Sequence, residues 1–163
     1  MSLDPAGANL IVTDSGNYII RQIVLGPLPV PPPYPPPSPP APPPPYGASP
    51  TPIMVTTLVG GSSAASCTHV DGPALGAGLV PVGLTMDYAG CGGAGCLYWA
   101  EVFQAGANAI RKLDMSTGQT TTLTGFTSCP AGTNNGYVDG PATSACFSNP
   151  SSIVFVPSTG EWL

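Results

Sequence analysis

Few side chains in this sequence could do chemistry: there are five cysteines, one histidine, eight acidic residues and three basic residues. A zinc site needs about four ligands, so the lone histidine, His69, cannot hold a metal by itself. The sequence has no Ser-His-Asp context and no phosphate-binding glycine loop ahead of a helix. Asp71 and Asp139 both stand in Asp-Gly-Pro, and this recurrence favours turn capping over paired-carboxylate catalysis. We therefore expect a protein that is not an enzyme and that carries no cofactor or metal.

Disulfide formation is the chemistry that the cysteines favour. Cys91 and Cys96 enclose four small residues at a predicted hairpin tip, where paired strands bring two Cβ atoms close together. A metal site is the alternative, but the second pair of ligands that it needs is missing. Cys129 and Cys146 flank a later loop and form a second candidate pair, which would leave Cys67 with a partner outside this chain. Five cysteines also indicate an oxidising compartment.

An internal repeat supplies the elements that position these residues. Residues 97–114, LYWAEVFQAGANAIRKLD, match residues 10–23, LIVTDSGNYIIRQI, since each stretch has an apolar strand ending in an acid, an asparagine, and then Ile-Arg. Two further pairs of segments recur in the same order: 56–60 (TTLVG) with 121–125 (TTLTG), and 70–74 (VDGPA) with 138–142 (VDGPA). Several markers repeated in one order predict a repeated structural unit.

Each unit is predicted to contain four short antiparallel strands joined by tight turns. In the second copy these strands are 83–87, 97–101, 109–113 and 119–124. Residues 81–90 also align with residues 150–160, which places the first strand of a third unit there. The strands are mostly apolar on both faces, as expected for strands that neighbouring units cover on both sides.

Arg21 and Arg111 occupy equivalent positions in the two copies. An arginine at a repeated site predicts an architectural ion pair, because repeated placement serves the structure that repeats. Asp14 and Glu101, which recur at the ends of the preceding strands, are the candidate partners. A binding role for the two arginines is the alternative interpretation.

The order of Asp-Gly-Pro-Ala, a strand, Leu-Tyr-x-Ala, Asn-x-Ile-Arg-Lys-Leu-Asp and Thr-Thr-Leu-x-Gly resembles the NHL-repeat β-propeller family, over nearly everything outside residues 26–54. The strand pattern agrees, because a repeated four-stranded antiparallel unit is typical of propeller blades. The resemblance implies an all-β partial propeller, with two blades formed by residues 1–25 and 55–125 and the start of a third in residues 126–163. Some family members are lyases whose metal is held by several histidines, and the single histidine argues against that activity; others bind protein, RNA or ligands on one face.

Propellers close with about four to eight blades, so two blades and a fraction cannot close alone. We expect either a window on a longer polypeptide or a subunit whose broken blade another copy completes. The strand that matches Leu10–Asp14 would follow Leu163, and a neighbouring copy could supply it. Met1 aligns with apolar positions of an inner strand and is not followed by a signal peptide, which predicts that residue 1 is not the biological start.

The composition of the chain argues against nucleic acid and membranes as partners. Only 11 of the 163 residues are charged, with a net charge of −5, and three basic residues cannot build the positive surface that nucleic acid requires. No apolar run has the length of a membrane span, so we expect no membrane association. Low charge with abundant Ser, Thr and Gly is typical of a secreted or wall protein whose solubility comes from attached sugar.

A proline-rich insertion, residues 26–54, separates the third and fourth strands of the first unit and holds 16 of the 23 prolines. Proline locks φ and removes the backbone donor, which predicts a polyproline II rod; at ~3.1 Å per residue, Pro27–Pro45 spans about 59 Å. A semi-rigid spacer or an SH3/WW-type ligand is one interpretation. The other rests on Tyr-Pro-Pro-Pro-Ser-Pro-Pro, which resembles the hydroxyproline-rich glycoproteins of plant and green-algal cell walls.

That second resemblance implies prolines that are hydroxylated and O-glycosylated, and a serine that carries sugar. The sequence Asn149-Pro-Ser fails as an N-glycosylation site, so any glycan is expected to be O-linked. The implied modification sites are Pro31, Pro32, Pro33, Pro35, Pro36, Pro37, Ser38, Pro39, Pro40, Pro42, Pro43, Pro44 and Pro45.

These features together predict a structural extracellular glycoprotein, a segment or subunit of a wall or filament assembly in the cell wall, at the cell surface or in a secreted filament. Its expected partners are other copies or the remaining blades of the same polypeptide, and covalent O-glycans. The alternative is an extracellular propeller module that recognises a protein or a glycan with one face. A lyase-type NHL enzyme is the third possibility.

We expect mass spectrometry of the peptide containing Pro31–Pro45, taken from native material, to show hydroxyproline and a ladder of added sugar masses. The prediction rests on the Pro-Pro-Pro-Tyr-Pro-Pro-Pro-Ser run in a chain that is expected to be secreted and that carries little charge. The same peptide from a bacterial expression host is the control and should carry neither modification. An unmodified peptide from the native source would refute the prediction.

Overall fold

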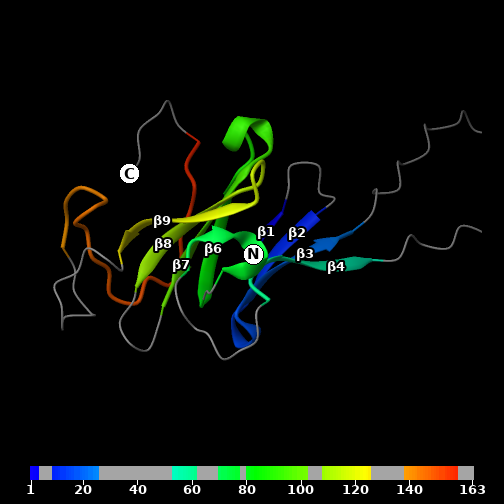
Figure 1. Cartoon of the computed structure of the whole chain (residues 1–163), viewed down its shortest axis with the longest axis horizontal. Helices are drawn as coiled ribbons and strands as arrows, with labels where there is room; N and C mark the ends of the chain where they lie inside the picture. The colour runs from blue at the N-terminus through cyan, green and yellow to red at the C-terminus, as the bar shows by residue number, and fades with distance from the viewer. Residues whose placement is uncertain are drawn as a thin grey trace, which may run out of the picture.

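The computed structural model describes residues 1–3, 9–25, 53–61, 70–77, 80–102, 108–125 and 138–157. This part of the chain is all-β, as predicted, with two antiparallel sheets and three short 3₁₀ helices (Figure 1). None of these helices has the length and hydrophobicity that a membrane crossing requires. The predicted polyproline rod and all of its implied sugar sites lie outside the described residues.

The first sheet is built in chain order from four strands: β1 (Ser2–Leu3), β2 (Asn9–Asp14), β3 (Ile19–Val24) and β4 (Met54–Val59). Helix η1 (Ser15–Asn17) joins β2 to β3, and Asn17 Nδ2 donates to both carboxylate oxygens of Asp14, at 2.9 and 3.0 Å. The proline-rich insertion leaves the sheet after β3 and returns to it at β4. It therefore lengthens a strand connection, where an added segment does not break a strand.

The second sheet has the strand order β5-β9-β8-β7-β6. Four of its strands confirm the predicted ones to within two residues: β6 (Pro81–Asp87), β7 (Cys96–Glu101), β8 (Ala109–Asp114) and β9 (Gln119–Gly125). The prediction of four strands is incomplete, because β5 (Gly72–Pro73) pairs with the beginning of β9 as a fifth strand. Helix η2 (Ala74–Gly76) follows β5, and helix η3 (Cys91–Gly93) lies between β6 and β7.

The two sheets repeat each other in strand register. Arg21 pairs with Thr57 in the first sheet, and Arg111 pairs with Thr122 in the second. Each of these ladders has one register shift, and it lies between the arginine and the isoleucine before it. A bulge at the same place in both sheets belongs to the repeated unit. Bulges redirect the side chains beside them, and here those side chains include the two arginines. The repeat in the sequence is therefore a repeat of one sheet with one irregularity.

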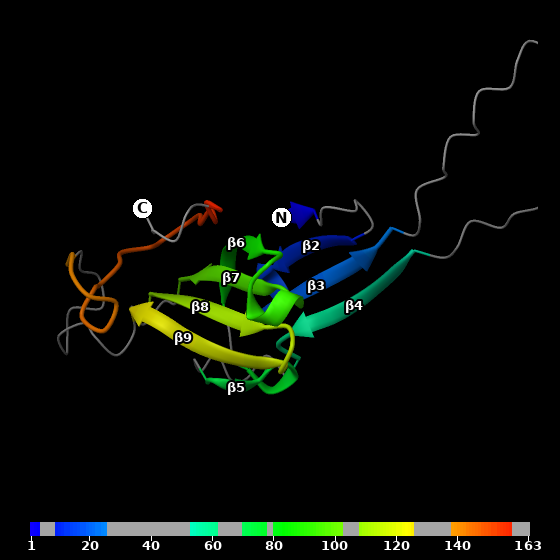
Figure 2. The same ribbon diagram turned by 90° about the horizontal axis from the view of Figure 1, so that it is seen from above.

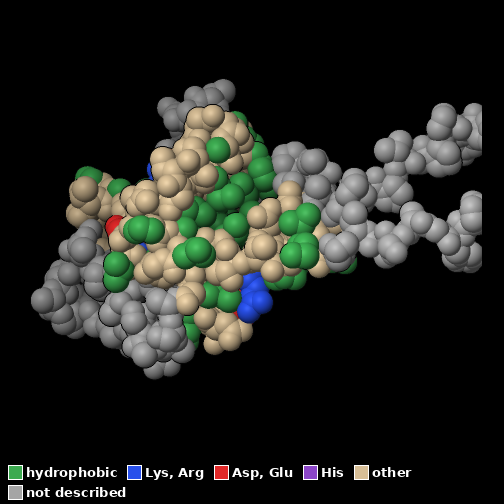
Figure 3. Space-filling model, turned by 45° about the vertical axis from the view of Figure 1, so that its right-hand side comes forward, with side chains coloured by type: hydrophobic (Ala, Val, Ile, Leu, Met, Phe, Trp, Pro, Cys, Tyr) green, Lys and Arg blue, Asp and Glu red, His purple; other side chains and the backbone are tan. Residues whose placement is uncertain are grey.

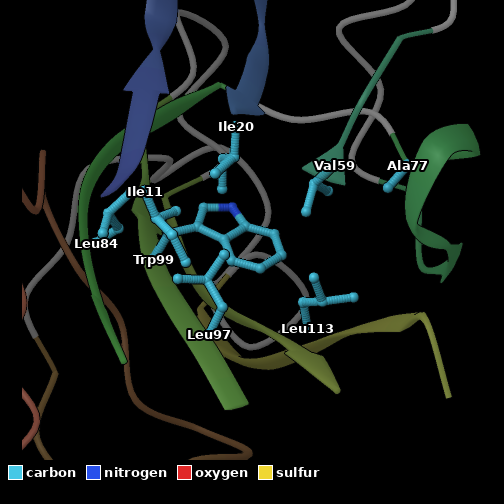
Figure 4. Close-up of a cluster of buried hydrophobic side chains, with 8 residues drawn as sticks. All are labelled: Ile11, Ile20, Val59, Ala77, Leu84, Leu97, Trp99 and Leu113. Carbon is cyan, nitrogen blue, oxygen red and sulfur yellow. The ribbon is translucent and has the colours of Figure 1, made fainter. Parts of the chain in front are cut away.

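A hydrophobic core joins the two sheets. Successive side chains of a strand point to opposite faces, so alternate residues of each sheet turn toward the other sheet. Trp99 lies among the core side chains and is fully buried (Figure 4). The other members of the core are Ile11, Ile20, Val59, Ala77, Leu84, Leu97 and Leu113. Strand β6 contacts β2, and the two sheets lie side by side (Figure 2).

The strand predicted at the start of a third unit is not formed, because residues 150–157 carry no strand. They lie beside β6, where the amide of Phe155 donates to Thr85 Oγ1 at 3.0 Å. The approach is close, since a Cβ atom at Gly83 would stand 2.7 Å from the Cα atom of Ser152. A strand needs a continuous row of backbone partners, and the described part of the chain offers none to this segment.

The predicted disulfide between Cys91 and Cys96 is present, with Cα atoms 5.4 Å apart. The predicted cross-strand geometry is wrong in detail, because Cys91 lies in η3 while Cys96 begins β7, so the bond closes the turn between β6 and β7. Cys146 is also disulfide-bonded, whereas Cys129 and Cys67 lie outside the described residues. Disulfides indicate an oxidising compartment.

Replacing both Cys91 and Cys96 with serine should lower the free energy of unfolding by about 2 kcal/mol, because the bond restricts a short loop in the unfolded chain. Urea unfolding followed by tryptophan fluorescence measures this change. Substitution is the cleaner experiment, since a reductant would also break the bond of Cys146. An unchanged unfolding midpoint in the double variant would contradict the prediction.

Candidate functional site

The Arg111 network, formed by Val70, Asp71, Trp99, Glu101 and Arg111, is the main polar feature of the described interior. The Arg111 side chain is fully buried on β8, and its guanidinium carbon lies 5.6 Å from the centroid of the Trp99 ring. Nη1 lies 3.1 Å from Oε1 of the equally buried Glu101, which also accepts the indole N–H of Trp99 at 2.7 Å. Nη2 lies 2.9 Å from Asp71 Oδ1 and donates to the carbonyl oxygen of Val70 at 2.7 Å.

Both predicted pairs of an arginine with a neighbouring acid are confirmed. Arg111 binds Glu101, and Arg21 Nε lies 2.9 Å from Asp14 Oδ2. The two arginines differ in burial, since the side chain of Arg111 is 0% exposed and that of Arg21 is 38% exposed. The reason is the direction that each faces: Arg111 points toward the first sheet, whereas Arg21 points to the side of the first sheet away from the core.

The turn-capping role predicted for Asp71 is wrong. Asp71 Oδ2 accepts the backbone amide of Thr122 at 2.9 Å, and Oδ1 accepts the Thr122 hydroxyl at 3.0 Å in addition to Arg111. Asp71 therefore ties the segment before β5 to β8 and β9. Burial raises the pKa of Asp71, but the hydrogen bonds from Thr122 and Arg111 outweigh it and hold this pKa below its ordinary value of 3.8.

The Arg111 network serves architecture. Glu101 and Arg111 have no exposed surface, so no substrate reaches the ion pair between them. A buried charge that loses its partner costs roughly 3–5 kcal/mol, so each member holds the others in place. The network fixes the relative positions of four parts of the second sheet: the segment before β5, the end of β7, the middle of β8 and the middle of β9.

A hollow of about 730 Å³ lies against the other face of the second sheet. Strands β6 to β9 form one side of it, and residues between Gly140 and Phe155 form the other. None of the described residues that line it is charged. The side chains that shape it include Tyr98, Ile110, Leu123, Thr124, Phe147 and Phe155.

The internal repeat explains why the strands present this face. Tyr98, Ile110 and Thr124 occupy repeat positions whose counterparts in the first sheet belong to the core. Those counterparts are Ile11, Ile20 and Val59. In the first sheet, the second sheet covers this face; in the second sheet, the same face borders the hollow. The hollow is therefore the position at which a neighbouring sheet would lie if the repeat continued.

An aromatic pair closes part of the hollow. The rings of Tyr98 and Phe155 stack with centroids 6.3 Å apart and planes 5° from parallel. Burial, and then the negative charge of Asp87, raise the pKa of the Tyr98 hydroxyl. The hydroxyl of Thr124, on the same face, is buried and has no hydrogen-bond partner among the described residues. An occupant of the hollow would thus meet a largely apolar wall and the unpaired hydroxyl of Thr124.

Among the described residues, no three His, Cys, Asp or Glu side chains come together to hold a metal ion, and His69 lies outside those residues. The Cys91–Cys96 bond is in a turn, and its residues do not line the hollow. Reasoning from sequence missed the hollow, although the repeat carried the signal: positions equivalent to buried Ile11 and Ile20 should also be covered in the second sheet.

The sequence matches no protein-family model and no curated protein. Among solved structures, the fold is similar to that of a structural-genomics protein of unknown function from Bacteroides thetaiotaomicron, with a TM-score of 0.58 and 22% identity over 90% of this chain and 27% of that one. It is also similar to an auxiliary nutrient binding protein from Bacteroides ovatus, with a TM-score of 0.59 and 20% identity over 92% of this chain and 30% of that one. This chain spans less than a third of either protein, and the likeness concerns the fold.

Asp71→Asn should make stability less dependent on pH in acid. The folded pKa of Asp71 lies below 3.8, so its stabilising contribution is complete above that pH and is lost as the pH falls through the folded pKa. Urea unfolding should therefore show a large difference between wild type and Asp71→Asn near neutral pH, and a smaller one in acid. Thr122→Ser keeps the amide and the hydroxyl and is the control. A difference that stays constant with pH would contradict this account.

Proposed function

We propose that this chain is part of an extracellular structural glycoprotein, a segment or subunit of a wall or filament assembly built from NHL-like propeller blades. The hollow carries the proposal. It is an uncharged face formed at the repeat positions through which the first sheet packs on its neighbour. An apolar sheet face is stabilised when a further layer covers it, so we expect another sheet to pack on this face.

The strand order supports blades as the building unit. Strands β1 to β4 and strands β6 to β9 are two antiparallel meanders of four strands, with the same bulge in each. Four-stranded meanders that pack side by side are the pattern of propeller blades. The two solved chains with a similar fold are more than three times as long as the part that this chain matches, as expected if a few blades belong to a larger structure.

The proline-rich insertion supplies the glycoprotein half of the proposal. It is attached between Leu25, just after β3, and Ile53, just before β4, at one end of the first sheet. A chain with 11 charged residues in 163 needs another source of solubility, and sugar on the insertion provides one. The two cysteine sites that are bonded, Cys91–Cys96 and Cys146, support an oxidising extracellular location.

A second candidate function is an extracellular recognition module. The volume of the hollow, about 730 Å³, lies within the range of roughly 300–1,000 Å³ that is usual for small-ligand sites. The buried Thr124 hydroxyl, which lacks a partner in the described part of the chain, would orient a ligand. One protein of similar fold is named an auxiliary nutrient binding protein, which agrees with such a role.

Electron cryomicroscopy of the native material tests the first proposal against the second. We expect ordered polymers in which a β-sheet lies against Tyr98, Ile110 and Phe147. A soluble monomer with an open hollow would overturn the structural role. In that case NMR titration with oligosaccharides and short peptides should shift the resonances of Thr124 if the chain is a recognition module. Thr124→Val should then weaken the binding, while Thr117→Val, in the exposed turn between β8 and β9, should not.

A further inference from the structure

We infer that copies of this chain associate head to tail. The outer face of the first sheet, formed by Leu10, Val12, Arg21 and Ile23, enters the hollow of the next copy, and Arg21 there binds Asp139. This inference rests on the proposed structural function and names its partner as a second copy of the chain. Each element of the interface between the two sheets inside the chain has a counterpart on the outside of the molecule.

The apolar half of the interface follows from the repeat. Inside the chain, the second sheet fills the core with side chains that point toward the first sheet. Three of these are Leu97, Trp99 and Leu113. At the equivalent positions of the first sheet stand Leu10, Val12 and Ile23, which lie on the face away from the core and are only partly buried. Hydrophobic side chains gather on the face of the molecule seen in Figure 3, with a basic side chain at the surface next to them.

The sizes of the side chains on the two sides are complementary. In the interface within the chain, the large Trp99 of one sheet meets the aliphatic Ile11 and Ile20 of the other. In the proposed interface the large side chain is on the other partner. Tyr98, at the hollow, is the repeat equivalent of Ile11, and Val12, on the entering face, is the repeat equivalent of Trp99. A large residue opposite a small one in both cases fills the space to the density of a protein interior.

The charged half of the proposed interface has the same arrangement as the Arg111 network. Inside the chain, Arg111 binds two acids, Glu101 on its own sheet and Asp71 in the Val-Asp-Gly-Pro-Ala segment. Arg21, its equivalent, has Asp14 as its one acid among the described residues, and its buried Nε atom is not aligned for a hydrogen bond even to that carboxylate.

The acid that would complete the Arg21 site stands at the other end of the molecule. Asp139 is the equivalent of Asp71 in the second Val-Asp-Gly-Pro-Ala segment, and it is exposed. It has no hydrogen bond or ion pair among the described residues. Residues 138–148 and the first sheet lie on opposite sides of the second sheet (Figures 1 and 2). Arg21 and Asp139 of one chain are therefore too far apart to pair with each other, whereas Asp139 of one copy can reach Arg21 of the next.

The backbone has the same complementarity. Inside the chain, β5 lies beside Asp71 and pairs with the edge strand β9 at Gly72 and Thr120. The equivalent edge strand, β4, has no such neighbour in the described part of the first sheet, and Met54 and Val55 are 55% and 49% exposed. In the head-to-tail pair, the Gly-Pro that follows Asp139 covers β4 of the next copy as β5 covers β9. Residues 150–157 then lie where β1 lies, and β1, which is held by two residue pairs, gives way to them.

A contact between two different surfaces of one molecule propagates. If each copy adds by the rotation that relates the two sheets, the result is a ring or an open filament, depending on whether the rotation closes. The association also gives the hollow an occupant of defined chemistry, namely an uncharged β-sheet with one cation at its edge.

Analytical ultracentrifugation of the full chain, at a series of concentrations, tests the inference. We expect the wild type to self-associate, and Asp139→Arg and Arg21→Glu each to weaken the association at least about tenfold, because each places like charges in contact. The double variant Arg21→Glu with Asp139→Arg should recover association, since it reverses the pair. Thr117→Arg, which adds a charge in an exposed turn, is the control and should associate like the wild type.

Every other outcome overturns the inference: a wild type that stays monomeric, single variants that associate normally, or a double variant that stays as weak as the singles. Arg21→Gln keeps the test valid if Arg21→Glu unfolds, since it removes the cation without adding an acid beside Asp14, and it should also weaken association. If native material forms ordered polymers but the charge exchange has no effect, the structural function stands and the occupant is another blade. If native material is monomeric, both proposals fail.

Discussion

The buried cation of Arg111 is the constraint on which the second sheet depends. A guanidinium without exposed surface must find anions and acceptors inside the protein, since an unpaired buried charge is far more costly than the loss of one contact. Glu101 meets this need from the neighbouring strand, and Asp71 meets it from a segment about forty residues away along the chain. The bulge before Arg111 aims the side chain at both acids. One cation therefore sets the relative positions of β7, β8, β9 and the residues that begin β5.

The same constraint shows why so much of the fold could be predicted from the repeat. Arg21 and Arg111 recur with an acid at the end of the preceding strand, and a structural ion pair is the simplest reason for such recurrence. Strand positions followed from apolar runs bounded by glycine and from the Thr-Thr-Leu motif. The disulfide of Cys91 and Cys96 followed from spacing, because a short stretch of small residues at a strand connection brings the two Cβ atoms close together. These features are local, or they repeat, and each leaves a mark in the sequence.

What could not be predicted depends on contacts between distant segments. Asp71 was expected to cap its own turn, because Asp before Gly-Pro commonly does so. Its carboxylate instead accepts hydrogen bonds from Thr122 and Arg111. Strand β5 has two residues, too few for any periodic signal, and it forms because β9 offers a free edge. Residues 150–157 have the composition of a strand but lack a backbone partner. The hollow is likewise a property of two parts of the chain, strands β6 to β9 and residues 140–155, and it exists only once the second part folds back against the first.

The edge of the first sheet shows how the insertion and the sheet depend on each other. Sheet edges are usually protected by charged residues, whereas β4, Met54–Val59, carries none and is largely exposed. An uncharged edge pairs with any strand that comes near, which leads to aggregation. Here the sequence that enters β4 contains Pro50 and Pro52, and proline cannot donate to a sheet ladder. Pairing along β4 therefore cannot continue as a regular ladder into the insertion, and the edge open to a partner strand is limited to β4 itself.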